Sequence, residues 1–298
     1  MRPQDLARLV ALAALWGGSY LFMRFAVAAF GPVALIEVRV AIAAVVLVIY
    51  VRATQGSIGW QQHWRGYLFV GSVGMALPFV LIAQGLTAID ASTAAILNAL
   101  SPLFATVVAA LWIHERITAA KASGIALCLV GTVVLVGWTP APMSARQLVA
   151  AGCCVLATAL YGYTIVFTKV KLGHARPMAS AAGTLVVAAL ALLPFTPMHR
   201  DYAAIPGAAW VAALGLALLS TSLAFILYYR LIADVGPVKT ITVTLLVPVF
   251  GMVWGVLLLH EPVTPGRIAG CLIILSGCAL ILGLARLPLA NGDARRVS

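Results

Sequence analysis

Charged residues are scarce in this chain of 298 residues. Asp, Glu, Lys and Arg make up 9% of it, whereas hydrophobic residues make up 63%. A soluble domain carries about a quarter charged residues. Because so few polar groups cannot cover so much apolar surface, the composition excludes an ordinary soluble fold and indicates a protein that lipid surrounds.

Several signatures of chemistry are also missing. The five histidines and five cysteines show no metal-ligand spacing, and an odd number of cysteines inside apolar runs is no disulfide framework. No glycine-rich nucleotide loop is present, so ATP does not drive the protein directly. We therefore expect no metal and no cofactor. The net charge of +11 follows from the placement of loops rather than from a nucleic-acid partner, and we expect none.

Long apolar runs are what the chain has in abundance. Runs of about 20 residues can cross about 30 Å of hydrocarbon as helices. These runs do not alternate polar with apolar residues, so strands of a barrel are excluded. The sequence predicts an all-α polytopic membrane protein. Its ten transmembrane helices are expected at 6–28, 33–51, 66–86, 91–113, 122–138, 147–168, 178–196, 207–230, 238–259 and 266–285, before a cytoplasmic tail at 286–298.

One pattern is present twice in the chain. The second copy follows the first by 146 positions, as 248 − 102 and 261 − 115 show. The first copy contains Pro102, Phe104, His114, Glu115, Thr118, Gly124, Gly131 and Gly137, and the second contains Pro248, Phe250, His260, Glu261, Thr264, Gly270, Gly277 and Gly283. Trp16-Gly17 and Tyr161-Gly162 match at an offset of 145, so the first span has a partner and is not a cleaved signal peptide.

Each repeat contains five spans, 6–138 and 147–285. Because five is odd, the second repeat must enter the membrane from the opposite side. Inverted repeats of this kind are typical of secondary transporters, whose substrates bind near the membrane midplane where the repeats meet. The basic residues agree, since Lys and Arg favour cytoplasmic loops and most of them then lie on the side of the N-terminus. We expect both termini to be cytoplasmic.

Trp16-Gly17-Gly18-Ser19, Arg39 and the doubled Pro-x-Phe … Glu-x-x-Thr … Gly pattern resemble the EamA-type transporters of the drug/metabolite transporter superfamily. The resemblance covers residues 6–285 and is nearest to bacterial inner-membrane amino-acid exporters. It implies a multi-pass protein of the inner membrane. His114 and His260 depart from the family pattern, in which glycine is commoner before the glutamate.

The sequence and this resemblance predict a secondary transporter, and not an enzyme. It would export amino acids, aromatic ones among them, or related small metabolites by alternating access. An alternative is an exporter or exchanger of organic cations, drugs or nucleotide sugars. An intramembrane enzyme is a remote alternative, because no histidine lies in a span beside the serines there. The expected partners are a small-molecule substrate and lipid, and the oligomeric state stays open, a monomer included.

Two charged residues of the second run are candidates for ion coupling or an ion pair, namely Glu37 and Arg39. A charge inside the membrane costs several kcal/mol unless it is paired or wet, so it marks a functional candidate. Glu37 is either a proton or substrate-amine site or one partner of a structural ion pair. Arg39 lies on a different face of the helix. Glu37 is therefore expected to pair with Arg24 or with a neighbouring span.

Aromatic and polar side chains at matched depths are expected to line the crevice between the repeats. Gln84 matches Tyr229, and Asn98 matches Thr244. The candidates are Trp16, Tyr20, Phe79, Gln84, Asn98, Ser101, Tyr161, Tyr163, Tyr228, Tyr229, Thr244 and Trp254. The alternative is that they form helix-to-helix contacts without a ligand.

Two further pairs of residues are expected to shape the helices. Glu115 and Glu261 would each cap the next span, because an acid is stabilised at a helix N-terminus. Pro102 and Pro248 would break or kink their spans, because proline removes a backbone donor.

Overall fold

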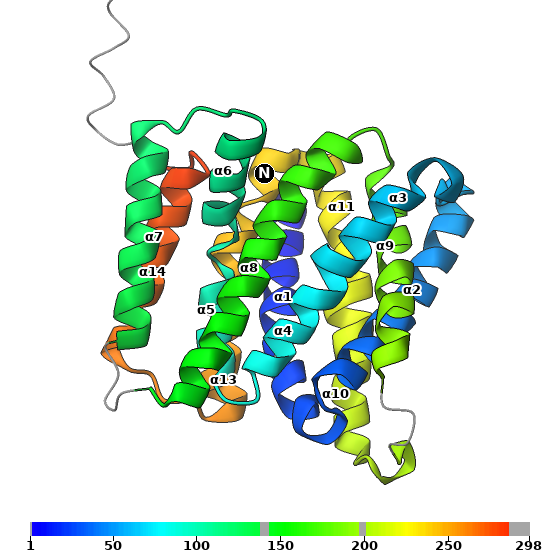
Figure 1. Ribbon diagram of the computed structural model, residues 1–298, viewed down its shortest axis with the longest axis horizontal. Coiled ribbons are helices and arrows are strands. Elements are labelled where there is room, and N and C mark those ends of the chain that lie inside the picture. Colours follow the sequence, from blue (N-terminus) through cyan, green and yellow to red (C-terminus); the bar gives the residue numbers. More distant parts are fainter. Residues whose placement is uncertain (1, 138–142, 197–200, 286–298) are drawn as a thin grey trace, which may run out of the picture.

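The computed structural model describes residues 2–137, 143–196 and 201–285. The expected tail 286–298 and Trp138, the end of the fifth run, lie outside the described residues. Within them the chain forms helices and turns only, packed as one bundle (Figure 1).

The first repeat contains five spans in chain order. The first two are α1 (Pro3–Phe30) and α2 (Pro32–Gln55). The third is continuous but passes through a π-helical turn, as α3 (Trp60–Gly71), η1 (Ser72–Ala76) and α4 (Leu77–Gly85). The fourth is broken into α5 (Ala91–Asn98) and α6 (Ser101–Trp112), and the fifth is α7 (Ala119–Gly137).

The second repeat follows the same plan. It begins with α8 (Ala145–Lys171) and α9 (Pro177–Leu192), which is followed by the short helices η2 (Leu193–Phe195) and η3 (Tyr202–Ala204). The next span is α10 (Gly207–Ala217), η4 (Leu218–Leu223) and α11 (Ala224–Val235). The last two are α12 (Pro237–Thr240) with α13 (Val243–Leu259), and α14 (Pro265–Ile281).

The ten-span fold is confirmed. The described residues contain eight helices that are long and apolar enough to cross a membrane, and two shorter apolar ones, Val243–Leu259 and Pro265–Ile281. The largest difference from the expected ends is in the third span, which begins at Trp60 rather than at residue 66. Its first turn is polar, with Gln61, Gln62 and His63 exposed or half-buried, so hydropathy alone does not reveal it.

Successive spans run in opposite directions, so the bundle has two ends. We call the end where the chain begins the proximal end; it also holds the turns near Gly56, at 113–118 and near Gly236. The opposite, distal end holds the turns near Gly31, at 86–90 and at 260–264 (Figure 1).

Close glycine contacts show how the repeats are related. A Cβ atom on Gly17 of α1 would lie 2.7 Å from Cβ of Phe250 in α13, and one on Gly162 of α8 would lie 2.5 Å from Cβ of Phe104 in α6. Gly17 and Gly162 are equivalent in the repeat, as are Phe104 and Phe250. Each glycine therefore meets the phenylalanine of the other repeat. The same contact occurs twice, once with the glycine from the first repeat and once with the glycine from the second.

The last spans of the two repeats make a second exchanged contact. A Cβ on Gly124 of α7 would lie 2.6 Å from the carbonyl oxygen of Gly277 in α14, and one on Gly277 would lie 2.6 Å from the carbonyl oxygen of Gly124. Small residues let helix backbones approach closely in lipid. The buried thiols of Cys128 and Cys278 lie 3.7 Å apart in the same interface, and all five cysteines are free.

The His-Glu turns share an unusual backbone. His114 has φ of 54° and His260 has φ of 55°, the left-handed region in which other residues than glycine are strained. Each histidine follows the end of its helix, α6 or α13, a place where chains commonly adopt this conformation to satisfy the last carbonyl groups. The glycine that is usual there in the family thus has a physical reason.

Replacing these histidines by glycine is expected to stabilise the fold. Because the left-handed conformation costs a non-glycine residue about 1 kcal/mol, His260→Gly and His114→Gly should each raise the midpoint of thermal unfolding in detergent. Both side chains are exposed, so little packing is lost. His174→Gly, in an exposed turn with negative φ, is the control and should not stabilise. Equal shifts of the unfolding midpoint for all three substitutions would contradict backbone strain at His114 and His260.

Candidate functional site

Arg39 of α2 is the most deeply buried charged side chain in the centre of the bundle, with 5% of its surface exposed. Its Nε donates a hydrogen bond to Oγ1 of Thr221, 2.9 Å away. The guanidinium lies over the ring of Phe79, 3.8 Å from the ring centroid. Its Nη1 lies 3.8 Å from the sulfur of Met23. Helices of both repeats thus meet at this side chain.

The π-helical turn η4 orients Thr221. The Thr221 hydroxyl donates to the carbonyl oxygen of Leu216, five residues earlier, at 2.8 Å. The hydroxyl proton of Thr221 is therefore used in this bond, and a lone pair of its oxygen is free to accept the hydrogen bond from Arg39. Single π-helical turns within α-helices are frequent at functional sites. In the first repeat η1 overlaps the equivalent position, because an offset of 145 places Ala76, its last residue, at Thr221 of η4.

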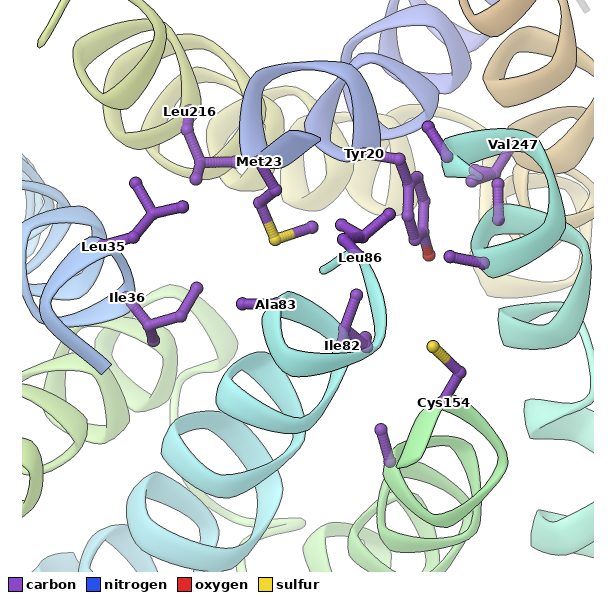
Figure 2. Packing of buried hydrophobic residues seen from close by; sticks show 14 of the residues in the cluster. Tyr20, Met23, Leu35, Ile36, Ile82, Ala83, Leu86, Cys154, Leu216 and Val247 are labelled. Atoms are coloured by element: carbon purple, nitrogen blue, oxygen red, sulfur yellow. The ribbon is translucent and has the colours of Figure 1, made fainter. Parts of the chain in front are cut away.

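Two tyrosines complete the group around Arg39. Both lie close enough to interact electrostatically with the guanidinium. Tyr20 points from α1 toward Cys154 of α8, between Leu86, just after α4, and Val247 of α13 (Figure 2). Tyr161 of α8 packs edge-on against Phe79, with ring centroids 6.3 Å apart. The structure therefore brings together Tyr20, Arg39, Phe79 and Tyr161, which we call the arginine site.

A second aromatic group lies beside the arginine site. Trp16 is one helical turn before Tyr20 on the same face of α1. Its ring lies 5.2 Å from that of Tyr228, and the rings of Tyr228 and Tyr229 lie 5.1 Å apart. Three more of the predicted residues are thus neighbours, at the contact between α1 and α11.

The break in the fourth span exposes polar groups inside the bundle. Asn98 ends α5, and its buried Oδ1 has no hydrogen-bond partner among the described residues. Ser101 begins α6 and donates to the carbonyl oxygen of Asn98 at 2.9 Å. Pro102 follows directly, so the predicted break is present in this repeat.

The proline of the second repeat lies at a different place relative to the helix break. Pro248 lies inside the continuous helix α13, and the break falls at Ile241–Thr242, before that helix begins. Pro248 therefore does not break its helix, which leaves a kink as the expectation for this proline. Thr244, the counterpart of Asn98, donates to the carbonyl oxygen of Ile241 at 2.7 Å, which satisfies it locally.

Two predicted residues lie away from these groups. Gln84 is exposed and does not face Tyr229; it lines a distal cavity of about 290 Å³ between α4 and α8, beside Thr87, Arg146 and Cys153. Tyr163 is exposed on the outside of α8 and stacks on Trp112, with centroids 5.3 Å apart. Because of these positions, Gln84 and Tyr163 do not share a binding role with the residues of the arginine site.

Trp254 has a structural contact instead. Its Nε1 donates to the carbonyl oxygen of Ala14 at 3.0 Å, which holds α13 against α1.

Glu37 does not form the expected pair with Arg24. Arg24 donates to the carbonyl oxygen of Leu86 at 2.5 Å. Oε2 of Glu37 is buried and has no hydrogen-bond partner in the described part of the chain. The ion-pair prediction overlooked that a free carbonyl at the end of α4 can satisfy Arg24.

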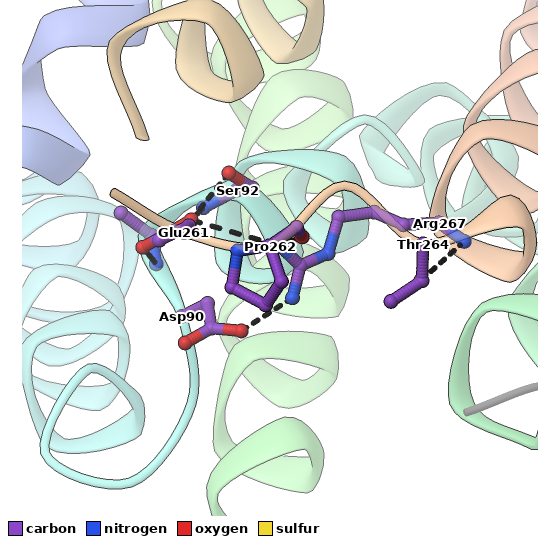
Figure 3. Close-up of polar contacts among 7 residues, drawn as sticks. Asp90, Ser92, Glu261, Pro262, Thr264 and Arg267 are labelled. Atoms are coloured by element: carbon purple, nitrogen blue, oxygen red, sulfur yellow. Dashed lines mark hydrogen bonds and ion pairs between the residues drawn. The ribbon is translucent and has the colours of Figure 1, made fainter. Parts of the chain in front are cut away.

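The second His-Glu turn makes a buried contact with the first repeat (Figure 3). Glu261, which is 8% exposed, accepts hydrogen bonds from the backbone N–H groups of Ala91 and Ser92 at 2.7 and 3.0 Å, and from the Ser92 hydroxyl. It therefore caps α5 of the other repeat, and the prediction that it caps the next span is wrong. Thr264 caps α14, accepting from the N–H of Arg267 at 3.2 Å.

Arg267 strengthens this contact from the same turn (Figure 3). One of its terminal nitrogens donates to the carbonyl oxygen of Pro262 at 2.7 Å, and the other pairs with Asp90, the residue before α5. Asp90, Ser92, Glu261 and Arg267 form what we call the distal cluster. It ties the turn at 260–264 to the turn at 86–90 and so joins the two repeats at the distal end.

The equivalent residues of the first repeat make no such contact. Glu115 and Lys121 precede Glu261 and Arg267 by 146 positions, and they pair with each other at 2.5 Å on the exposed proximal surface. The hydrogen bond from Lys121 lowers the pKa of the Glu115 carboxyl. Thr118 caps α7, accepting from the N–H of Lys121 at 3.3 Å, so Glu115 does not act as its predicted cap. Among the described residues, no hydrogen bond or ion pair joins this turn to the second repeat.

Two functional features escaped the sequence reasoning. Thr221 was not singled out, although a hydroxyl in an apolar run that must find a partner was a usable signal. The distal cluster was missed because a cap across repeats cannot be read from local spacing. In the sequence, only the residues Asp90-Ala91-Ser92 at the start of α5 hinted at the distal cluster.

Ten spans in two repeats that make equivalent contacts with each other, and a polar site between the repeats, define a membrane transporter. The model of the EamA-like transporter family matches residues 6–137 and 148–283, and the chain belongs to this family. It is accordingly a multi-pass membrane transporter rather than an enzyme.

Individual relatives are distant. The chain is 24% identical to the uncharacterized transporter YoaV of Bacillus subtilis, over 90% of this chain and 93% of that protein. It is 26% identical to a probable terminal-alkyne amino-acid exporter of Streptantibioticus cattleyicolor, over 92% of this chain and 91% of the relative. A crystal structure with 18% identity matches with a TM-score of 0.68, over 96% of this chain and 99% of that one, and supports the fold.

Proposed function

We propose that this transporter exports amino acids, aromatic ones among them, or related small metabolites, and that it works by alternating access. The observation that carries the mechanism is a difference between two equivalent turns. The distal cluster ties the turn of the second repeat to the first repeat, whereas the equivalent turn with Glu115 and Lys121 has no such tie to the second repeat. At the proximal end the repeats are joined elsewhere, by the ion pair of Arg8 with Asp234 and by the hydrogen bond that Arg176 donates to the carbonyl oxygen of Gln55. Because the repeats are inverted, exchanging their conformations would release the distal cluster and let the equivalent contact form at the proximal end.

The charge distribution supports an orientation for this cycle. Exposed basic residues such as Arg52, Arg65 and Arg116 lie at the proximal end. Lys and Arg favour the cytoplasmic side. We therefore assign the proximal end and both termini to the cytoplasm of a bacterium, with the protein in its inner membrane.

Two features support amino acids over the alternatives. The distant relative from Streptantibioticus cattleyicolor is named as a probable amino-acid exporter. The arginine site presents a cation between aromatic rings, and a cation there disfavours organic cations as substrates.

The proposal is tested in sealed liposomes that contain the purified protein. Vesicles preloaded with unlabelled amino acid should accumulate labelled amino acid faster than empty vesicles do, because exchange needs substrate on both sides. Protein-free vesicles are the control. The proposal would be contradicted if no amino acid of a broad panel gave substrate-dependent flux.

Glu37 is our candidate for coupling transport to protons. Its carboxylate has a buried oxygen without a partner, so either protonation state is poorly satisfied and can respond to the transport cycle. Glu37→Gln removes the titrating group and is expected to make flux insensitive to pH in the same vesicles. The exposed Glu115→Gln is the control and should keep the wild-type pH profile. A wild-type profile for Glu37→Gln would remove the coupling role.

A further inference from the structure

Arg39 is a buried cation without a counter-ion. None of the carboxylates in the described residues lies within 4.0 Å of its guanidinium, and Glu37 projects from a different face of the same helix. The other acids near arginine or lysine side chains pair elsewhere, at the two ends of the bundle. Burying an unpaired charge costs several kcal/mol, so its presence requires an explanation other than stability.

The contacts of Arg39 leave much of its hydrogen-bonding capacity unused. A guanidinium has five N–H donors. One of them reaches Thr221 and one faces the weak acceptor Met23 sulfur. The ring of Phe79 covers a face of the guanidinium rather than its edge. Three donors therefore have no acceptor among the described residues.

The neighbouring tyrosines add further unused donors. Neither the Tyr20 nor the Tyr161 hydroxyl forms a side-chain hydrogen bond within the described residues, and both side chains lie within electrostatic range of Arg39. A group that accepts several hydrogen bonds and carries negative charge would satisfy all three side chains at once.

We propose that Arg39 binds the carboxylate of the transported substrate, with the hydroxyls of Tyr20 and Tyr161 beside it and the ring of Phe79 against the substrate's apolar part. This inference rests on the proposed function and assigns its substrate class, small organic carboxylates with amino acids among them. A carboxylate matches the planar fork of arginine with two parallel hydrogen bonds.

A phosphate group fits less well. A dianion would call for a second cation, and Arg24, which lies deep in α1, is occupied by the carbonyl oxygen of Leu86. The site therefore favours a singly charged carboxylate over a sugar nucleotide or a phosphate ester.

Competition with matched compounds tests the assignment in the liposome exchange assay. Phenylalanine, its amide and the decarboxylated phenethylamine share one ring and differ at the carboxylate. We expect phenylalanine alone to compete with the labelled amino acid. Competition by the amine or the amide at similar concentrations would overturn the assignment, as would competition by a phosphate ester of similar size.

Variants locate the binding to this side chain. Arg39→Gln should weaken competition by the amino acid about a hundredfold, because charge-assisted hydrogen bonds are lost. Arg39→Lys keeps the charge but not the fork, and should retain an intermediate affinity. Arg65→Gln, at an exposed proximal position, is the control and should match the wild type. A folded Arg39→Gln protein with wild-type affinity would overturn the proposal.

Binding measured without transport separates the two proposals. Phenylalanine should raise the unfolding temperature of the detergent-solubilised wild type but not of Arg39→Gln. Stabilisation without flux would refute the exporter function and keep the carboxylate site. Flux of amino acids together with equal flux of their amines would refute the site and keep the exporter function.

Discussion

Glu261→Gln is expected to lower the midpoint of thermal unfolding by several degrees and to slow exchange in liposomes. The glutamine can still accept one hydrogen bond, but its amide N–H₂ would face the donors of Ala91 or Ser92. Losing hydrogen bonds to a buried carboxylate costs about 3 kcal/mol. The substitution also removes one of the two carboxylates beside Arg267, the one 3.9 Å away, and leaves its pair with Asp90.

Glu115→Gln is the matched control, because Glu115 is the equivalent residue of the other repeat. Its carboxylate is exposed and pairs only with Lys121. Exposed ion pairs contribute little to stability. We expect a wild-type unfolding temperature for this variant in a thermal scan. Equal effects of the two substitutions would show that the distal cluster does not hold the repeats together.

Gly162→Ala is expected to destabilise the protein by about 3 kcal/mol or to prevent folding. The added Cβ would lie 2.5 Å from Cβ of Phe104 and 2.6 Å from the backbone nitrogen of Ala105. Backbone atoms cannot turn away as a flexible side chain does, so α8 and α6 must separate. Monodisperse protein in size-exclusion chromatography and the unfolding midpoint measure the effect.

Gly152→Ala serves as the matched control on the same helix. A Cβ at Gly152 meets nothing within 4 Å. Alanine also favours the helical conformation over glycine by about 1 kcal/mol. We expect this variant to be as stable as the wild type or more so. Similar losses at both positions would contradict the close contact between the repeats.

The fold was predictable from the sequence because its causes are local or repeated. Apolar runs mark the spans by length alone, and the fixed offset between Pro102 and Pro248, or Glu115 and Glu261, reveals the two repeats. The helix ends were less accurate where polar residues begin a span, as at Trp60.

The site was only partly predictable. Tyr20, Arg39, Phe79 and Tyr161 were candidates by type and depth, and the structure brings them together. Gln84 and Tyr163 were candidates by the same rule but face outward, because depth in the membrane does not fix the direction of a side chain. The different roles of Glu115 and Glu261 could not be read from the sequence, since identical residues in identical repeats take different partners.

Distances between spin labels test alternating access most directly. In a background without the five native cysteines, one label pair at Thr87 and Val263 reports the distal end, and another at Ile117 and Ala233 reports the proximal end. On addition of a transported amino acid, we expect the distal distance to lengthen and the proximal one to shorten in a fraction of the molecules. Distances that stay unchanged with a transported substrate, or that lengthen together, would contradict the exchange of conformations between the two repeats.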